Sequence, residues 1–291
     1  MKSAAKVVVV PDHTLSFAER MERLSKKRSE LIRPVQERPR DYVLLSIRDV
    51  AAKLGTDPAT VLRTVRGLGF ESYREFKAYL HQLSIASATS LDGMQAVSKP
   101  NSSLLSQGAR ALDQDLQNLQ ALRNTLDMNR IVAIARRVYA ARKILVLGGD
   151  LAASLAEYLE YNLTLLGFTV VAGITPGKTI NAVRSFDRHD LVFAISFRRG
   201  LRQTVEGMKQ ARANGAYCVG ITDSFVSPIC RFSDECLLAS IESHLGTSYA
   251  APMSLFNVML TICAHYREAR TMKTLKKLDQ EQRHGYRWYP V

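Results

Sequence analysis

The sequence predicts an α/β protein in which an N-terminal all-helical helix–turn–helix domain is followed by a doubly wound parallel α/β domain. Two observations support this fold class. Up to residue 84, apolar side chains recur at three- and four-residue intervals, which is the period of a helix. From residue 143 on, short β-rich apolar runs alternate with helical stretches, and their continuous apolarity indicates strands that are buried on both faces.

The composition indicates a globular protein with two domains and is compatible with a polyanionic partner. The chain has 291 residues, of which 46% are hydrophobic, and a formal net charge of +13. The positive charge is densest at the two ends, which suits nucleic-acid binding near the N-terminus but also a basic protein that is merely soluble. No apolar run approaches the ~20 residues that cross a bilayer, and the first residues make a poor signal peptide. We therefore expect a cytoplasmic protein without a membrane partner.

The segment 46–70 predicts two short helices that are joined by a tight turn. Ser46 and Asp49 have the spacing of a capping box at the start of the first helix. Gly55 follows this helix, at a position where a positive φ carries no Cβ penalty. Asp57 then caps the second helix.

The second helix of this pair has one apolar side and one side suited to the major groove of DNA. Val61, Val65 and Leu68 fall on the apolar side, against the first helix. Small, hydroxyl and arginine side chains lie roughly opposite, and they permit close approach and hydrogen bonds to bases. The expected DNA-binding residues are Arg48, Lys53, Ala59, Thr60, Arg63, Thr64 and Arg66, with Arg48 and Lys53 at phosphates. The alternative is a helical hairpin with a solvated basic face.

Further helices complete this first domain, which we place at residues 16–84. A short amphipathic helix is expected from Phe17 to Leu24, after a loose arm at residues 1–15. The segment Ser29 to Gln36 also reads as helical, although Pro34 should kink it or begin a new turn. Tyr73, Phe76 and Leu80 mark another helix after the central pair.

Residues 85–129 are interpreted as a linker followed by a connecting helix. The chain is rich in Ser, Ala and Thr up to about Lys99. The segment from Leu104 to Leu126 then predicts a strong helix. Its apolar stripe consists of Leu105, Ala109, Leu112, Leu116, Leu119 and Leu122. This stripe is either a dimer seam or part of the core of a single chain.

Five apolar runs predict the strands of the second domain, which we place at residues 130–270. The runs are 143–148, 169–173, 191–196, 217–222 and 235–240, and the helical stretches between most of them are 151–166, 201–214 and 252–267. Ligands of parallel α/β sheets bind at the carboxyl ends of the strands, so a site is expected at 148–150, 196–200, 222–224 and 242–244. Residues 271–291 are interpreted as a basic tail, whose end at 284–291 should be poorly ordered unless it docks on a partner chain.

Cysteine and histidine spacing argues against metal chemistry. Cys218, Cys230, Cys236 and Cys263 show no CxxC spacing and are expected to be buried, reduced thiols of a protein from a reducing compartment. The histidines at 189, 244 and 265 are scattered, so neither a metal site nor a cofactor is expected.

Taken together, these segments resemble the RpiR family of bacterial transcriptional regulators over about residues 24–268. SIRDVAAKLGTDPATVLRTVRGLGF followed by ESYREFKAYL is similar to the family's helix–turn–helix signature, with Asp57 where Ser is usual. VLGGDLAASLAEYLEYNLTLLG, AISFRRGLRQTVEGMKQARANGA and GITDSFVSPICRFSDECLL follow the order of its sugar isomerase (SIS) domain. The resemblance implies binding to an operator and sensing of a phosphosugar.

Two loops depart from the family's phosphate-binding pattern. Where the first loop usually reads Gly-x-Gly-x-Ser, this chain has Gly148, Asp150 and Ala152. Where the second reads Ser-x-Ser-Gly-x-Thr, this chain reads SFRRGL over residues 196–201. Arginine binds phosphate and carboxylate well, so an anionic effector is still expected, unless the arginines face solvent or pair with Asp150. The implied effector-binding residues are Gly148, Asp150, Ser196, Arg198, Arg199 and Glu242.

The sequence thus predicts a transcriptional regulator rather than an enzyme. We expect a homodimer or homotetramer that binds a double-stranded DNA operator. Its second domain would sense a small anionic metabolite, a phosphosugar or a sugar acid, and change the geometry between paired DNA-binding domains. The alternatives are a sugar-phosphate isomerase with an accessory helical domain and a regulator whose second domain only dimerises. Loss of the Ser-rich loops and the absence of an acid–base pair argue against the isomerase.

Overall fold

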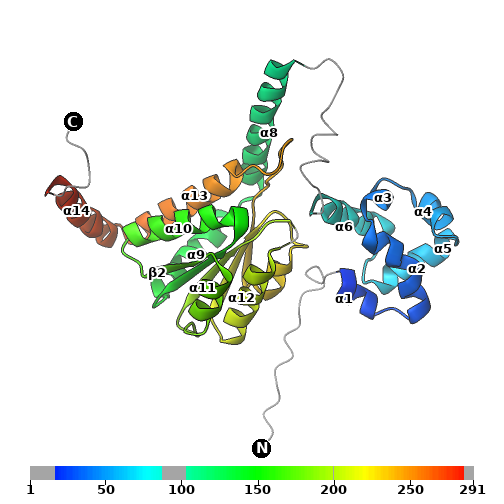
Figure 1. Cartoon of the computed structure of the whole chain (residues 1–291), viewed down its shortest axis with the longest axis horizontal. Coiled ribbons are helices and arrows are strands. Elements are labelled where there is room, and N and C mark those ends of the chain that lie inside the picture. The colour runs from blue at the N-terminus through cyan, green and yellow to red at the C-terminus, as the bar shows by residue number, and fades with distance from the viewer. Residues whose placement is uncertain (1–16, 87–102, 199, 285–291) are drawn as a thin grey trace, which may run out of the picture.

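The computed structural model describes residues 17–86, 103–198 and 200–284, which form a helical region and an α/β region (Figure 1). The predictions for the arm 1–15, most of the linker 85–99, Arg199 and the end of the tail concern residues outside these ranges. The helical region consists of α1 (Phe17–Glu22), α2 (Lys26–Glu37), α3 (Arg40–Val43), α4 (Ile47–Lys53), α5 (Pro58–Gly67) and α6 (Tyr73–Ala86).

The helical region has its own apolar core, and both predicted caps of the central helix pair are present. The hydroxyl of Ser46 accepts from the backbone N–H of Asp49, whose carboxylate accepts from Ser46 in return. Asp57 caps α5 by accepting from the N–H of Thr60, and Gly55 between the helices has φ of 65°. α2 continues through Pro34 to Glu37, so the prediction that Pro34 could begin a new turn is wrong. Pro34 lies in the last turn of α2, so the one hydrogen bond that it cannot donate, to the carbonyl of Glu30, affects only the end of the helix.

A buried arginine joins the first helix to the end of the helix pair. Arg20 of α1 is only 3% exposed, and its guanidinium lies 4.3 Å from the centre of the Phe70 ring. Its Nη1 donates to the carbonyl of Leu68 at 2.9 Å. This carbonyl closes α5, so a charge-assisted hydrogen bond and a cation–π contact hold α1 against that end of the pair.

The α/β region contains a sheet of five parallel strands in the order β2-β1-β3-β4-β5. The strands are β1 (Ile144–Gly148), β2 (Val170–Gly173), β3 (Leu191–Ile195), β4 (Tyr217–Thr222) and β5 (Glu235–Leu238). Each coincides with one of the five predicted apolar runs. All residues of β1 and β3 are buried, as a strand covered on both faces requires. The predicted fold class is therefore confirmed.

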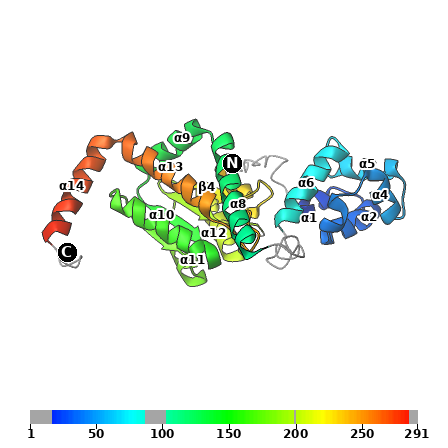
Figure 2. The same ribbon diagram turned by 90° about the horizontal axis from the view of Figure 1, so that it is seen from above.

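Helices cover both faces of the sheet (Figures 1 and 2). α9 (Met128–Ala140), α10 (Ala153–Leu165) and α13 (Ala250–Tyr266) share one core with Ile144, Phe193 and Val219 of the strands. α11 (Pro176–Val183) and α12 (Arg202–Ala213) share the opposite core with Leu145 and Val192. The 3₁₀ turns η2 (Asp150–Ala152) and η3 (Pro228–Phe232) follow β1 and β4. No helix of the described residues is long and apolar enough to span a bilayer.

Two long helices lie before and after this core. α8 (Leu104–Thr125) is the predicted connecting helix, and only the later part of its stripe packs on the core: Leu122 is buried, whereas Leu112 and Leu116 are 69% and 63% exposed. α14 (Glu268–His284) is a helix that includes much of the predicted basic tail.

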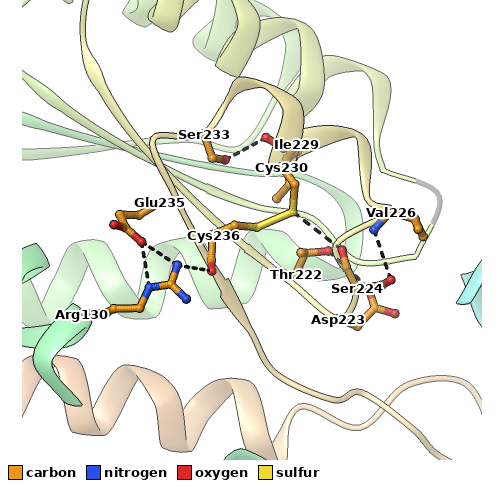
Figure 3. Close-up of a disulfide and its surroundings, with 10 residues drawn as sticks. All are labelled: Arg130, Thr222, Asp223, Ser224, Val226, Ile229, Cys230, Ser233, Glu235 and Cys236. Carbon is orange, nitrogen blue, oxygen red and sulfur yellow. Dashed lines mark hydrogen bonds and ion pairs between the residues drawn. A yellow bond between two sulfur atoms is a disulfide. The ribbon is translucent and has the colours of Figure 1, made fainter. Parts of the chain in front are cut away.

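The expectation that all cysteines are reduced is also wrong. Cys230 of η3 and Cys236 of β5 form a disulfide, with their Cα atoms 5.7 Å apart (Figure 3). Cys218 and Cys263 are free and buried, and burial raises the pKa of each thiol to about 12. The disulfide joins the turn after β4 to the neighbouring strand. Within the described residues, no group of three or more His, Cys, Asp or Glu side chains could hold a metal ion.

These thiol states predict the alkylation pattern of the purified protein. At pH 8 the native, unreduced chain should not react with iodoacetamide, because thiols with a pKa of about 12 are almost wholly protonated and are buried. Unfolding without a reductant should expose the two free thiols, and addition of a reductant should raise the count to all four cysteines. Mass spectrometry of the alkylated protein measures both counts. Four labelled cysteines without reductant would contradict the disulfide.

Candidate functional site

The outer side of α5 carries a chain of hydrogen-bonded side chains. The hydroxyl of Thr60 donates to Asp57 Oδ2 at 2.6 Å, and Arg63 Nη2 donates to the Thr60 hydroxyl at 3.0 Å. The side-chain and backbone hydrogen bonds from Thr60 lower the pKa of the Asp57 carboxyl. The cap of the helix therefore also orients the first arginine of its exposed side.

The structure places the predicted DNA-binding residues unequally. Arg48, Ala59, Arg63 and Arg66 are exposed, and Thr60 is half-buried beside them. Lys53 remains partly exposed, but its Nζ donates to the carbonyl of Asp41 at 3.1 Å and lies 4.5 Å from the centre of the Tyr42 ring.

Thr64 requires a correction. It is fully buried, and its hydroxyl donates to the carbonyl of Thr60 at 2.9 Å. It lies one turn after Val61 and next to Val65, so it belongs to the packed side of α5 and cannot contact DNA.

A cavity of about 280 Å³ lies at the carboxyl ends of β1 and β3, where ligands of parallel α/β sheets bind. The loop after β1 and the loop after β3 form two of its walls, and the segment after β5 forms a third. It is lined by Gly149, Asp150, Leu151, Ala152, Ser196, Phe197, Arg198, Gly200, Leu201, Ile241, Thr247 and Tyr249. The amino ends of η2 and α12 adjoin it, so their partial positive charges favour an anion.

The cavity contains the two non-glycine residues that have positive φ in the described part of the chain. These are Asp150, with φ of 54°, and Arg198, with φ of 56°. Left-handed backbone costs a side-chain-bearing residue on the order of 1–2 kcal/mol, although Asp tolerates it better than most. Asp150 occupies the position at which the related sequence pattern has Gly, and Gly would adopt this positive φ without strain.

Hydrogen bonds hold Arg198 in this conformation. Its backbone N–H donates to Asp223 Oδ1 at 2.8 Å, and its Nη2 donates to the carbonyl of Gly246 at 2.9 Å. The buried hydroxyl of Ser196 accepts from the N–H of Leu201 at 3.0 Å. Arg198 thus connects the loop after β3 with the loop after β4 and with the segment after β5. Among the described residues, no ion pair joins Arg198 to Asp150.

Tyr249 contributes a polar group that the sequence analysis missed. Its ring lies 5.8 Å from that of Phe197, and burial raises the pKa of its hydroxyl. The charge of Asp150 raises this pKa further, whereas a hydrogen bond with Thr247 and the charge of Arg198 lower it. The phenol therefore stays protonated at neutral pH. Tyr249 follows the last strand by eleven residues, and no strand-end pattern reaches that far.

The predicted effector residues fall into three groups. Asp150, Ser196 and Arg198 line the cavity together. Gly148 and Glu242 lie beside it without lining it, and Arg199 is outside the described residues. The carbonyl of Glu242 accepts from Nδ2 of the buried Asn118 on α8 at 2.8 Å, and Asn118 Oδ1 accepts from the hydroxyl of Ser240 at 2.8 Å. Glu242 is thus anchored through its backbone.

Comparisons with known proteins agree with this geometry. The model of the SIS domain matches residues 137–265. The HTH-type transcriptional regulator HexR of Pseudomonas aeruginosa is 27% identical over 256 residues, which cover 84% of this chain and 83% of HexR. The sugar isomerase domain of an RpiR transcription factor from Sphaerobacter thermophilus is similar over 60% of this chain and 98% of its own length, with a TM-score of 0.57 and 24% identity. NanR of Vibrio vulnificus, solved with ManNAc-6P, is similar over 93% of this chain and 98% of its own, with a TM-score of 0.59 and 21% identity.

The parallel sheet and the matched residues define the class of this domain: residues 137–265 form a SIS domain. The likeness to HexR shows that the chain, with its N-terminal helical region, is distantly related to HTH-type transcriptional regulators. The likeness to the RpiR and NanR structures shows that the fold is shared.

The last residue of β1 supports the wall of the cavity sterically. A Cβ at Gly148 would lie 2.6 Å from the carbonyl oxygen of Ala152, which belongs to backbone that cannot move freely. Gly148→Ala should therefore lower the free energy of unfolding by about 1–3 kcal/mol in urea titrations. Gly177→Ala is the matched control, because a Cβ there meets nothing within 4 Å. Its stability should be unchanged or slightly higher. Equal stability of the two variants would contradict this packing.

Proposed function

We propose that the protein is a DNA-binding transcriptional regulator whose SIS domain binds a small anionic, sugar-derived metabolite and thereby alters operator binding. One observation carries the proposal. The second of two capped helices exposes Arg63 and Arg66 beside the half-buried Thr60, and the same chain has a cavity with an arginine at the carboxyl ends of parallel strands. The domains proposed for these roles are residues 16–84 and 130–270, with 85–129 connecting them.

The DNA-binding part rests on the exposed side of α5. Arg63 is held by Thr60, so less side-chain entropy is lost when its guanidinium meets a guanine edge. Arg48 at the start of α4 is exposed and suits a phosphate contact. Lys53 is a weaker candidate, because its ammonium already contacts the carbonyl of Asp41.

The effector part rests on the cavity. Arg198 supplies a positive charge, the amino ends of η2 and α12 add partial positive charge, and Ser196 and Tyr249 supply hydroxyls. A sugar that bears a phosphate or carboxylate matches this combination of charge and hydroxyl groups. The relative NanR was solved with ManNAc-6P, which is a ligand of this chemistry. Asp150 would accept a hydrogen bond from a sugar hydroxyl.

The isomerase alternative is less well supported. The ionisable side chains that line the described cavity are Asp150, Arg198 and Tyr249. Proton transfer between sugar carbons requires an acid–base group near neutral pKa, and burial raises the pKa of Tyr249 away from that range. A SIS domain that only dimerises is the other alternative, and ligand binding distinguishes it from our proposal.

Assembly and coupling are proposed to involve α8. Its exposed leucines at 104, 105, 112 and 116 form an apolar side that suits a second copy of the chain, as a homodimer or homotetramer requires. The segment after β5 is hydrogen-bonded to the same helix through Asn118 and through Asp115, which accepts from the Ser248 hydroxyl at 2.5 Å. A ligand that moves this segment would therefore act on the helix that precedes the domain.

Arginine substitutions test the DNA-binding surface. Arg63→Ala should cost about 1–3 kcal/mol of operator affinity but little affinity for random duplex, because it removes a base contact. Arg48→Ala should weaken operator and random DNA alike and reduce the salt slope by about one unit, because it removes a phosphate contact. Fluorescence anisotropy titrations at several salt concentrations measure both effects. Arg136→Ala, an exposed arginine of α9, is the control for loss of one charge. Unchanged operator affinity of the Arg63 variant would contradict the proposed orientation of α5.

An effector screen tests the cavity. Calorimetry of the full chain against hexose 6-phosphates, N-acetylhexosamine 6-phosphates and sugar acids should yield a ligand that changes operator affinity. Arg198→Gly should weaken the binding of that ligand by roughly tenfold or more, because a charge-assisted hydrogen bond to the ligand is lost. Glycine at this position adopts the positive φ without strain, so the fold should be retained. Operator affinity without ligand should be unchanged. Arg184→Ala on the exposed end of α11 is the control. Ligand binding equal to wild type in the Arg198 variant would place the effector elsewhere.

A further inference from the structure

A second hollow, of about 640 Å³, lies at the amino end of the sheet, on the edge opposite to the effector cavity. Tyr217 begins β4, and Asp234 immediately precedes β5, so both mark this edge. We call this hollow the basic groove, because five cationic side chains from four segments line it. They are Arg137 of α9, Arg188 before β3, Lys209 and Arg212 of α12, and Arg231 of η3.

Two of these five charges are compensated within the protein. Arg212 Nη1 donates to Asp234 Oδ1 at 2.7 Å, and the other oxygen of this carboxylate accepts from the backbone N–H of Cys218 at 2.8 Å. Asp234 is the one carboxylate among the described residues that line the groove, and both of its oxygens are thus occupied. Arg231 forms an ion pair with Glu19 of α1.

The other three cations line the same groove, and within the described residues only Lys209 has a carboxylate partner, which is a weak one. Arg137 lies over the ring of Tyr217, 4.3 Å from its centre, and this contact leaves its charge in place. Arg188 has neither a hydrogen bond nor an ion pair from its side chain within the part of the chain that the structure describes. Lys209 Nζ lies 3.9 Å from Glu206, but both side chains are mostly exposed, and such a pair contributes little. Like charges around one hollow repel each other unless an anion enters.

We propose that the basic groove binds a small polyphosphate, such as the phosphate tail of a nucleotide. Its volume lies within the range of small-molecule sites. Three cations that meet from α9, α12 and the turn before β3 match a ligand with several closely spaced negative charges, and arginine suits phosphate oxygens in particular. A DNA duplex is too wide to enter a hollow of this size and would meet only its rim. This site is separate from the effector cavity and does not depend on the proposed function.

The experiment compares probes of different charge on the full chain. Calorimetry with sodium tripolyphosphate and with orthophosphate should show tighter binding of the tripolyphosphate. Arg188→Ala combined with Lys209→Ala should weaken it by roughly tenfold or more, because two phosphate contacts are lost. These two side chains hold no other element in place, whereas Arg137 and Arg212 do and are left unchanged. Arg136→Ala combined with Arg184→Ala removes the same charge elsewhere on the domain and should change affinity by less than about threefold.

Four outcomes would overturn the proposal. The first is an absence of tripolyphosphate binding by the wild-type chain at millimolar concentration. The second is equal binding by the Arg188/Lys209 variant and the wild type. The third is loss of tripolyphosphate binding in Arg198→Gly, which would assign the anion to the effector cavity. The fourth is a combined result: the wild-type chain does not bind tripolyphosphate, and the Arg188/Lys209 variant loses affinity for duplex DNA. That result would make the groove a DNA contact.

Discussion

The parallel direction of all five strands is the constraint on which the rest of the α/β region depends. Parallel pairing brings every carboxyl end to one edge of the sheet and every amino end to the other. Helices must then return the chain across the faces, and they bury both of them. The chain leaves β1 and β3 at neighbouring positions, which is why Asp150 and Arg198 line one cavity although they are far apart in sequence. The same geometry collects Arg188 and Tyr217 at the opposite edge.

Backbone strain marks the cavity at the carboxyl ends of β1 and β3, where we propose that the effector binds, as a structured site rather than a gap between loops. Positive φ at two side-chain-bearing residues is unfavourable unless the surroundings hold it in place. At Arg198, the carboxylate of Asp223 does so by accepting the backbone N–H, while the carbonyl of Gly246 fixes the guanidinium. The side chain is therefore positioned before any ligand arrives, which reduces the entropy that binding must overcome.

Much of the fold can be predicted from local patterns in the sequence, whereas most of the wrong or missing predictions depend on contacts between distant parts of the chain. Continuous apolar runs predict all five strands, most clearly β1 and β3, because a strand buried on both faces leaves little other choice of residue. α11 was missed because it has only eight residues and begins with Pro176 and Gly177. The residue type of Thr64 suggests a contact with DNA, but its spacing from Val61 places it on the packed side of α5. The Cys230–Cys236 disulfide could not be predicted, since it depends on η3 folding back onto β5.

The residues of the cavity at the strand ends, such as Asp150 and Arg198, could be predicted from the sequence. Tyr249 could not, because it lies in the segment after β5, at a position that no sequence pattern marks.

Asn118 has a consequence for the mechanics of α8. This helix extends from the core with exposed leucines along its first half, and apolar packing alone would let it slide or rotate. The buried Asn118 amide donates to the carbonyl of Glu242 and accepts from the hydroxyl of Ser240, and this pair of hydrogen bonds allows only one position of α8. If α8 shifted by one residue, these polar atoms would be buried without partners. The Asn118 amide thus fixes the rotation of α8 about its axis, and with it the direction in which the exposed leucines of α8 point.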